Sequence, residues 1–117
     1  MSRVLFVSHD ADLRAVAARV LTREGFDVTT APHGGHALIA CIHETFDALV
    51  VEDRLPEGPG AALAATLARH CPGLRLVRMG TAAARHVEQG DGVLLRRPFT
   101  ADDLLAAIAT AAVPSAS

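Results

Sequence analysis

The stretch DALVVEDRLPEG, residues 47–58, decides the fold of this chain. Residues 48–51 form a continuous apolar run, which is typical of a strand buried on both faces of a parallel sheet. The run ends in two carboxylates, Glu52 and Asp53, and an arginine and a Leu-Pro pair follow. Glu52 and Asp53 are therefore the two candidates for a functional side chain at the tip of a buried strand.

Before this stretch, the chain alternates between strand and helix patterns. Residues 4–7 form another continuous apolar run, which ends in Ser8-His9-Asp10. Apolar residues at helical spacing follow up to Gly25, and Asp10 is placed to cap that helix. The sequence then predicts a strand at 26–30, a turn at 32–35 and a short helix at 37–44.

After the stretch, the same alternation continues. The sequence predicts a loop at 57–60, a helix at 61–70, a strand at 74–79, a helix at 81–88, a strand at 93–95 and a helix at 101–112 capped by Thr100. Five strands alternating with five helices predict an α/β fold with a doubly wound, five-stranded parallel sheet. We expect the strand order 2-1-3-4-5.

A sheet of this order places its functional crevice at the carboxyl ends of the first and third strands. One of these ends carries Ser8, His9 and Asp10, and the other carries Glu52 and Asp53. We therefore expect these side chains to meet. Because neighbouring residues of a strand point to opposite faces, only one of Glu52 and Asp53 can face the crevice.

Length and composition narrow the class of protein. The 117 residues suit one domain, which we place at 1–113, with 114–117 as a tail or the start of a linker. No apolar run approaches the ~20 residues of a membrane span, and Met1-Ser2-Arg3 leads directly into the first strand, so we expect a cytoplasmic protein. A net charge of -2 without a long basic block argues against direct contact with nucleic acid.

Cysteine and histidine usage does not predict a metal centre. Cys41 and Cys71 are far apart in the sequence and belong to no paired-cysteine motif, so we expect reduced, packed thiols. The six histidines lack the spacing of a tetrahedral zinc site. They are His9, His33, His36, His43, His70 and His86.

The chain from Val4 to about Ala112 resembles a response-regulator receiver domain of the CheY-like superfamily. The resemblance is carried by residues 47–56, by Arg97-Pro98-Phe99, by Asp12-Leu13-Arg14 and by the turn and helix at 31–38. It implies a role in two-component signalling and the phosphorelay. Receivers of this family accept a phosphoryl group on an aspartate, beside a magnesium ion and a lysine that offset the charge of the transferred group.

At the reactive positions of the family this sequence departs from the pattern. The acceptor aspartate lies four residues before the loop proline, which falls on Glu52. The acidic pair that holds magnesium falls on Ser8 and His9, with Asp10 one position late. Because magnesium requires oxygen ligands in near-octahedral geometry, this set predicts no metal.

Three further positions are altered. The hydroxyl position falls on Gly80 with Thr81 next to it, the lysine position falls on Arg97, and the aromatic of the last strand falls on Leu94. Together these changes predict an atypical pseudo-receiver with a degenerate phosphorylation site. We expect a non-phosphorylated protein-interaction module without enzymatic activity.

Two interpretations of Glu52 stay open. Its extra methylene extends the carboxylate towards the phosphoryl position, where Arg97 can pair with it, so that the two imitate the phosphorylated state. Alternatively, both are solvated charges at a decayed site, where an ion pair contributes little. A hydrolytic trio of Ser8, His9 and Glu52 is disfavoured because no oxyanion hole is predicted.

A shifted register gives the rival function. A slip of one residue would bring Asp53 into the crevice as the acceptor, with Asp10 and Thr81 as its helpers and magnesium as the cofactor. The same slip would turn Val50 and Val51 over, which disfavours it.

The resemblance also implies the kind of partner. We expect protein partners in signalling, such as a sensor kinase or an output domain, and neither a membrane nor nucleic acid. Receivers of this family commonly signal or dimerise through their fourth helix, fifth strand and fifth helix. A homodimer here would use residues 81–97 and the last helix, where Asp102 and Asp103 offer charges opposite to those of Arg85, Arg96 and Arg97.

Overall fold

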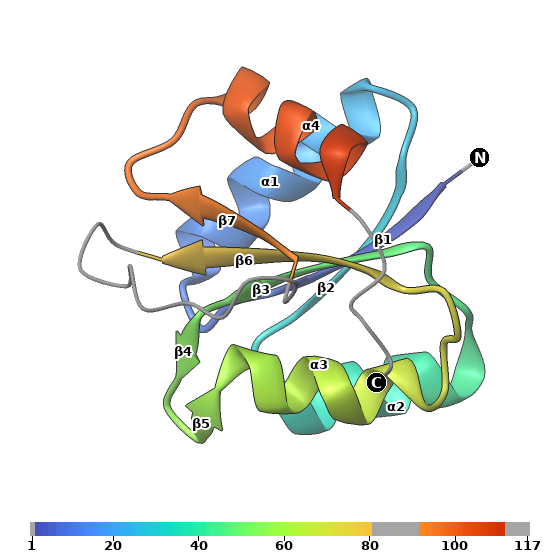
Figure 1. Cartoon of the computed structure of the whole chain (residues 1–117). Coiled ribbons are helices and arrows are strands. Elements are labelled where there is room, and N and C mark those ends of the chain that lie inside the picture. Colours follow the sequence, from blue (N-terminus) through green and yellow to red (C-terminus); the bar gives the residue numbers. More distant parts are fainter. Residues whose placement is uncertain (1, 81–91, 112–117) are drawn as a thin grey trace.

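A computed structural model describes residues 2–80 and 92–111. Five parallel strands form the sheet in the order β2-β1-β3-β6-β7 (Figure 1). The strands are β1 (Arg3–Val7), β2 (Asp27–Ala31), β3 (Ala48–Glu52), β6 (Arg75–Gly80) and β7 (Val93–Arg96). This is the predicted order once the two-residue strands β4 (Arg54–Leu55) and β5 (Gly58–Pro59), which form a separate ribbon, are set aside.

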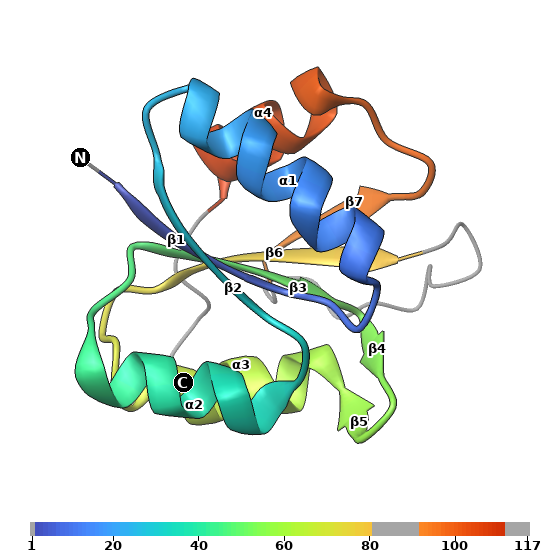
Figure 2. The same ribbon diagram turned by 180° about the vertical axis from the view of Figure 1, so that it is seen from behind.

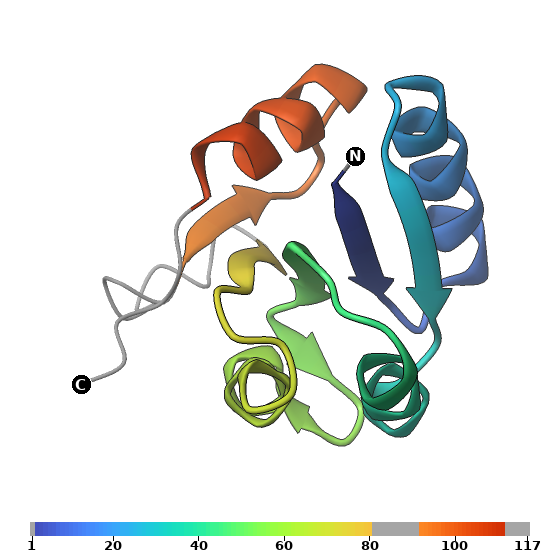
Figure 3. The ribbon, with the colours of Figure 1, turned by 90° about the vertical axis from the view of Figure 1, so that its right-hand side faces the viewer.

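Helices cover both faces of the sheet (Figures 1 and 2). The helices α1 (Ala11–Arg23) and α4 (Ala101–Thr110) lie on one face, and α2 (Gly34–His43) and α3 (Gly60–Ala68) lie side by side on the other (Figure 3). The helix predicted at 81–88 lies outside the described residues. In the part of the chain that the structure describes, no helix is both long and apolar enough to cross a membrane.

The continuous apolar runs contribute side chains to two separate hydrophobic cores. Leu5 and Val51 pack under α2 and α3, whereas Phe6 and Val50 pack under α1 and α4. Adjacent residues of a strand point to opposite faces, so each run must be apolar throughout to fill both cores. This explains why the first and third strands were recognisable without an alternating pattern.

The helix α2 begins at Gly34, earlier than the Ala37 expected from the sequence. His33 caps it, with Nδ1 accepting the backbone N–H of His36 at 3.2 Å. A carboxylate distant in the chain adds a second cap, since Glu57 Oε2 accepts the N–H of Gly34 at 2.6 Å. The two glycines predicted as a turn therefore form the first turn of the helix.

The predicted loop at 57–60 is more ordered than expected. Arg54 pairs with Pro59 and Leu55 with Gly58 in a short antiparallel ribbon. The chain then enters α3 at Gly60, where an added Cβ would collide with the backbone carbonyl of Glu52. A residue without a side chain is therefore required at this position.

The predicted caps of the outer helices are confirmed. Asp10 Oδ1 accepts the N–H groups of Asp12 at 3.0 Å and Leu13 at 3.2 Å. Thr100 and Asp103 form a reciprocal capping box at the start of α4. Side-chain oxygens that accept these N–H groups satisfy donors that the helix itself leaves unbonded.

The two cysteines are buried in the same core, under α2 and α3. Both are free thiols, as expected. Burial, with the neighbouring Cys71 thiol, raises the pKa of Cys41 from 9.0 to about 12. Cys41 is therefore a protonated packing group at neutral pH.

Candidate functional site

The candidate site lies where β1 and β3 end, at the same edge of the sheet. Glu52 is the last residue of β3, and Ser8 and His9 directly follow β1. Arg97 follows β7, and its backbone N–H donates to the carbonyl of Gly80 at 2.7 Å. The sheet thus brings Ser8, His9, Glu52 and Arg97 together, as the strand order predicted.

The carboxylate of Glu52 is the centre of this cluster. Its Oε2 accepts three hydrogen bonds, from Ser8 Oγ at 2.9 Å, His9 N at 3.0 Å and His9 Nδ1 at 2.6 Å. Its Oε1 accepts one from Arg97 Nη2 at 2.7 Å. Only 8% of the Glu52 side chain is exposed, so these donors replace the water that a carboxylate loses on burial.

This arrangement decides one question about Glu52. The predicted pairing with Arg97 is confirmed, and Glu52 is a buried group, not a solvated surface charge. Arg97 is about one third exposed, at 34% of its side chain, so its guanidinium covers the carboxylate from the solvent side. A charge-assisted hydrogen bond of this kind is shorter and stronger than a neutral one.

Ser8 and His9 have different roles around the carboxylate. Ser8 is fully buried, and its hydroxyl donates to Glu52 while accepting the N–H of Asp10 at 3.0 Å. His9 is exposed and directs Nδ1 at the carboxylate, which assigns the ring proton to that nitrogen when Glu52 is ionised. The Ser8 hydroxyl thus serves Glu52 directly, which differs from the nucleophile-to-base contact that a hydrolytic trio requires.

Asp53 points away from the cluster, as the alternation of the strand predicted. Its Oδ1 accepts from Arg78 Nη1 at 2.9 Å, and its backbone N–H donates to the carbonyl of Met79 at 2.6 Å. Glu52 lies opposite Met79 in the register between β3 and β6. This is the unshifted register, in which Glu52 and not Asp53 faces the ends of β1 and β7.

The other predicted residues lie in different places. Asp10 uses its carboxylate to cap α1, and Gly80 ends β6. Leu94 is half-buried on β7 opposite Arg78. Thr81 lies outside the described residues.

Two arginines near the site were not predicted. Arg78 is buried within β6 and holds Asp53, and Arg14 on α1 donates to the carbonyl of Ser8 at 2.7 Å. The signal for Arg78 was a charge in the middle of the predicted strand at 74–79, between Val77 and Met79, because a charge at a buried position requires a partner. Arg14 gave no comparable signal, since arginine is common on an amphipathic helix.

Comparisons with known proteins bear on the family. No protein-family model matches the chain. The chain is 34% identical over 109 residues to the transcriptional regulatory protein TcrA of Mycobacterium tuberculosis. The aligned region covers 89% of this chain and 43% of TcrA. The chain is 31% identical over 110 residues to the DNA-binding transcriptional regulator NtrC of Proteus hauseri, covering 90% of this chain and 23% of that one. The chain thus spans less than half the length of these relatives.

Solved structures agree in fold. A response regulator protein from Burkholderia pseudomallei superposes with a TM-score of 0.80 at 25% identity, covering 94% of this chain and 68% of that one. The chain is a CheY-like response-regulator receiver domain. The Burkholderia protein contains a phosphorylated aspartic acid and a calcium ion. This receiver domain has Glu52 at the position that the resemblance assigns to the acceptor.

The magnesium ion that the family implies does not fit the residues of this receiver domain. The hydroxyl of Ser8 is engaged as both donor and acceptor, and both oxygens of Glu52 are bonded. Asp10 caps α1, and Arg97 places a cation on the carboxylate. Within residues 2–80 and 92–111, no group of three or more His, Cys, Asp or Glu side chains could hold a metal ion.

Proposed function

We propose that this receiver domain is a non-phosphorylated, non-enzymatic protein-interaction module of a two-component, phosphorelay-type pathway in the cytoplasm. The observation that carries the proposal is that protein donors engage both carboxylate oxygens of Glu52. A phosphoacceptor must present an oxygen in line with the phosphodonor, whereas Oε2 of Glu52 faces three protein donors and Oε1 faces the guanidinium of Arg97. Withdrawing the carboxylate from these contacts would leave the buried Ser8 hydroxyl without its acceptor, which costs about 1–3 kcal/mol.

The same contacts support a permanent imitation of the phosphorylated state. Where the family implies a lysine bonded to the phosphoryl group, Arg97 is bonded to the carboxylate of Glu52 at 2.7 Å. Glutamate extends its charge by one methylene beyond aspartate, and the arginine reaches it without a phosphoryl group between them. The signalling conformation is then set by the sequence and not by a kinase.

We assign the partner surface to β7 and α4, and the partner to a sensor kinase or an output domain. Residues 81–88, which the sequence also predicts for this surface, lie outside the described residues. Two described residues support this surface, because both are accessible to a partner. Leu94 on β7 is half-buried, and Asp102 on α4 is exposed. The receiver domain extends over 1–113, with 114–117 as a tail or the start of a linker. This domain itself contacts neither DNA nor a membrane.

The competing function is a phosphorylatable receiver that uses Asp53 with Asp10, Thr81 and magnesium. Its support is that Asp53 is partly exposed, at 23% of its side chain. Against it stand the bond of Asp53 to Arg78 and the use of Asp10 as a helix cap. Both contacts would have to break before phosphoryl transfer.

The deciding experiment is incubation with acetyl phosphate and magnesium, followed by intact-mass spectrometry. We expect no phosphate-sized gain in mass. A gain that disappears in Asp53→Asn would establish the competing function, and a gain that disappears in Glu52→Gln would establish Glu52 as an acceptor. Amide chemical shifts measured with magnesium and beryllofluoride provide the second readout, and we expect no saturable change at residues 8–10 or 52–54.

A further inference from the structure

The helices α2 and α3 form an unusually apolar outer surface, which we call the α2–α3 face. The large apolar side chains exposed in the described part of the chain are Val16 at 49%, Ile39 at 58% and Ile42 at 59%. Ile39 and Ile42 both lie on α2. A pair of isoleucines one helical turn apart forms a ridge on this face.

Neither helix carries an aspartate, a glutamate or an arginine. The residues of α2 are GGHALIACIH and those of α3 are GAALAATLA. The exposed side of α3 consists of small side chains, including Ala62, Ala65 and Thr66. A surface helix ordinarily directs charged residues to the solvent, as α1 does with its acidic and basic residues. An apolar surface of this kind marks a contact with another molecule.

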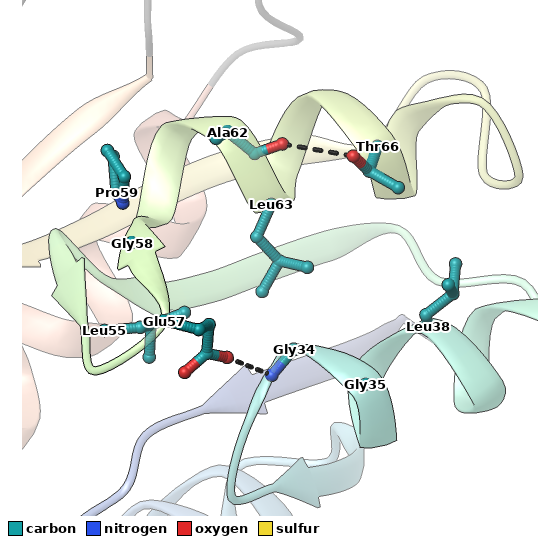
Figure 4. A pocket seen from close by; sticks show the side chains of 10 residues that line it. All are labelled: Gly34, Gly35, Leu38, Leu55, Glu57, Gly58, Pro59, Ala62, Leu63 and Thr66. Atoms are coloured by element: carbon teal, nitrogen blue, oxygen red, sulfur yellow. Dashed lines mark hydrogen bonds between the residues drawn. The ribbon is translucent and has the colours of Figure 1, made fainter.

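A groove of about 340 Å³ lies between the two helices. In Figure 4, Leu38 of α2 and Leu63 of α3 point into this space, and the ribbon with Pro59 closes one end. Ala62 and Thr66 line the α3 side. The small residues leave room for a bulky apolar side chain from a second molecule.

The charges lie at the two ends of the face and have opposite signs. Glu57 is exposed at the end where both helices begin, and its bond to Gly34 fixes it there. Arg69 and His70 are exposed at the end where α3 terminates. Glu44, which follows α2 at that end, is paired with Arg3. Between Glu57 and Arg69, the two helices themselves contain no aspartate, glutamate or arginine.

We propose that the α2–α3 face binds the same face of a second copy of this chain. The two-fold axis lies in the plane of the face and is perpendicular to the helices. An interface with two-fold symmetry must be complementary to itself. In this arrangement the helices of the two copies are antiparallel, so that Glu57 of each copy faces Arg69 of the other. Ile39 and Ile42 pack between the copies, and the alanines let the two α3 helices approach each other.

The size of the face sets the strength of the dimer. Helices of 10 and 9 residues are each about 15 Å long at ~1.5 Å per residue. Such a face buries less than the ~800 Å² per partner of a typical stable interface, and corresponds to the weak class of contacts. We expect a Kd on the order of 100 µM, which corresponds to an association rate of ~10⁷ M⁻¹s⁻¹ and a residence time of about a millisecond.

This assignment differs from the dimer expected from the sequence, which used residues 81–97 and the last helix. In the described residues of that surface, Arg97 is bonded to Glu52 and Asp103 to the backbone of Thr100. Arg96 and Asp102 remain exposed there, but none of the large exposed apolar side chains of the described residues lies on β7 or α4. The proposed dimer is also independent of whether the domain is phosphorylated.

Sedimentation equilibrium between ~10 µM and ~1 mM, around the expected Kd, tests the proposal. We expect the average mass to rise above the 12.2 kDa of one chain at the higher concentrations. Ile39→Glu should raise the Kd at least ~10-fold, a change of about 1.4 kcal/mol. Val16→Glu is the matched control, because Val16 is a comparably exposed apolar residue on α1, on the opposite face of the sheet, and should leave the Kd unchanged.

A second variant guards against loss of folding. Ala65→Arg, at an exposed helix position, should weaken the dimer in the same way, and circular dichroism verifies that each variant is folded. A wild-type chain that stays monomeric at ~1 mM, far above the expected Kd, overturns the proposal. So does a dimer that survives Ile39→Glu and Ala65→Arg but is lost in Asp102→Arg, because self-association then uses the surface of β7 and α4.

Discussion

Arg97 Nη2 lies 2.7 Å from Glu52 Oε1, and this bond joins the last strand of the sheet to its centre. The two residues stand 45 positions apart in the sequence. Their bond is part of a closed network in which Ser8 and His9 complete the shell around a buried carboxylate.

Replacement of Glu52 by glutamine should destabilise the domain. The amide keeps the shape but loses the charge that Arg97 and the other donors are arranged to meet, and one end of it presents a donor to other donors. We expect a loss of about 1–3 kcal/mol in the free energy of unfolding, measured by urea denaturation. Glu44→Gln is the control, because Glu44 forms an exposed pair with Arg3 at 3.6 Å and should change stability by less than about 1 kcal/mol. Equal effects of the two variants would contradict a special role for Glu52.

Asp53 and Arg78 should prove energetically coupled. Arg78 is buried, so it requires a charged partner, and Asp53→Asn removes that charge. Because Asp53 is partly exposed, we expect a moderate loss of about 1–2 kcal/mol. A double-mutant cycle with Arg78→Met measures the coupling, which should exceed about 0.5 kcal/mol. Additive effects would show that the bond contributes nothing.

Gly60→Ala should be destabilising because the new Cβ collides with the carbonyl of Glu52. The strand tip or the start of α3 must then shift, at a cost of about 1–3 kcal/mol. The matched control is Gly35→Ala in the first turn of α2, where the nearest atoms belong to the His33 ring at 3.4 Å. That substitution should be neutral or stabilising by up to about 1 kcal/mol. Thermal unfolding measures the stability of both variants. A loss in Gly60→Ala alone indicates the collision, whereas equal losses in both variants indicate a general effect of removing glycine.

The stability of the domain should fall as the pH rises above 9. The pKa of Cys41 is about 12 in the folded protein and 9.0 ordinarily, so between these values the unfolded chain releases a proton that the folded chain retains. Stability from this group is complete below pH 9 and is lost as the pH rises towards 12. The chain contains no tyrosine or lysine, which leaves few other groups to titrate there. Cys41→Ala should flatten the alkaline slope, and an unchanged slope would contradict the assignment.

The sequence predicted what depends on local patterns. The apolar runs at 4–7 and 48–51 predicted the central strands because a strand covered on both faces has no polar side. The caps at Asp10 and Thr100 were predicted because a cap acts within three residues of itself. Alternation within the strand correctly placed Glu52 in the site and Asp53 outside it.

Features that depend on contacts between segments distant in the sequence could not be predicted in this way. The start of α2 was misplaced because one of its caps, Glu57, comes from a different loop. The ribbon of β4 and β5 was missed because two-residue strands carry no periodic pattern. The buried environment of Glu52 could not be predicted either, since it depends on donors from Ser8, His9 and Arg97 that only the folded sheet brings together.

The enclosure of Glu52 makes the residues of the site depend on one another. Replacing Glu52 with aspartate would withdraw the carboxylate by one methylene. It would leave Ser8, His9 and Arg97 oriented towards an oxygen that is no longer within reach. Under the proposed function, converting this site to a phosphoacceptor would therefore require coordinated replacements at the ends of three strands.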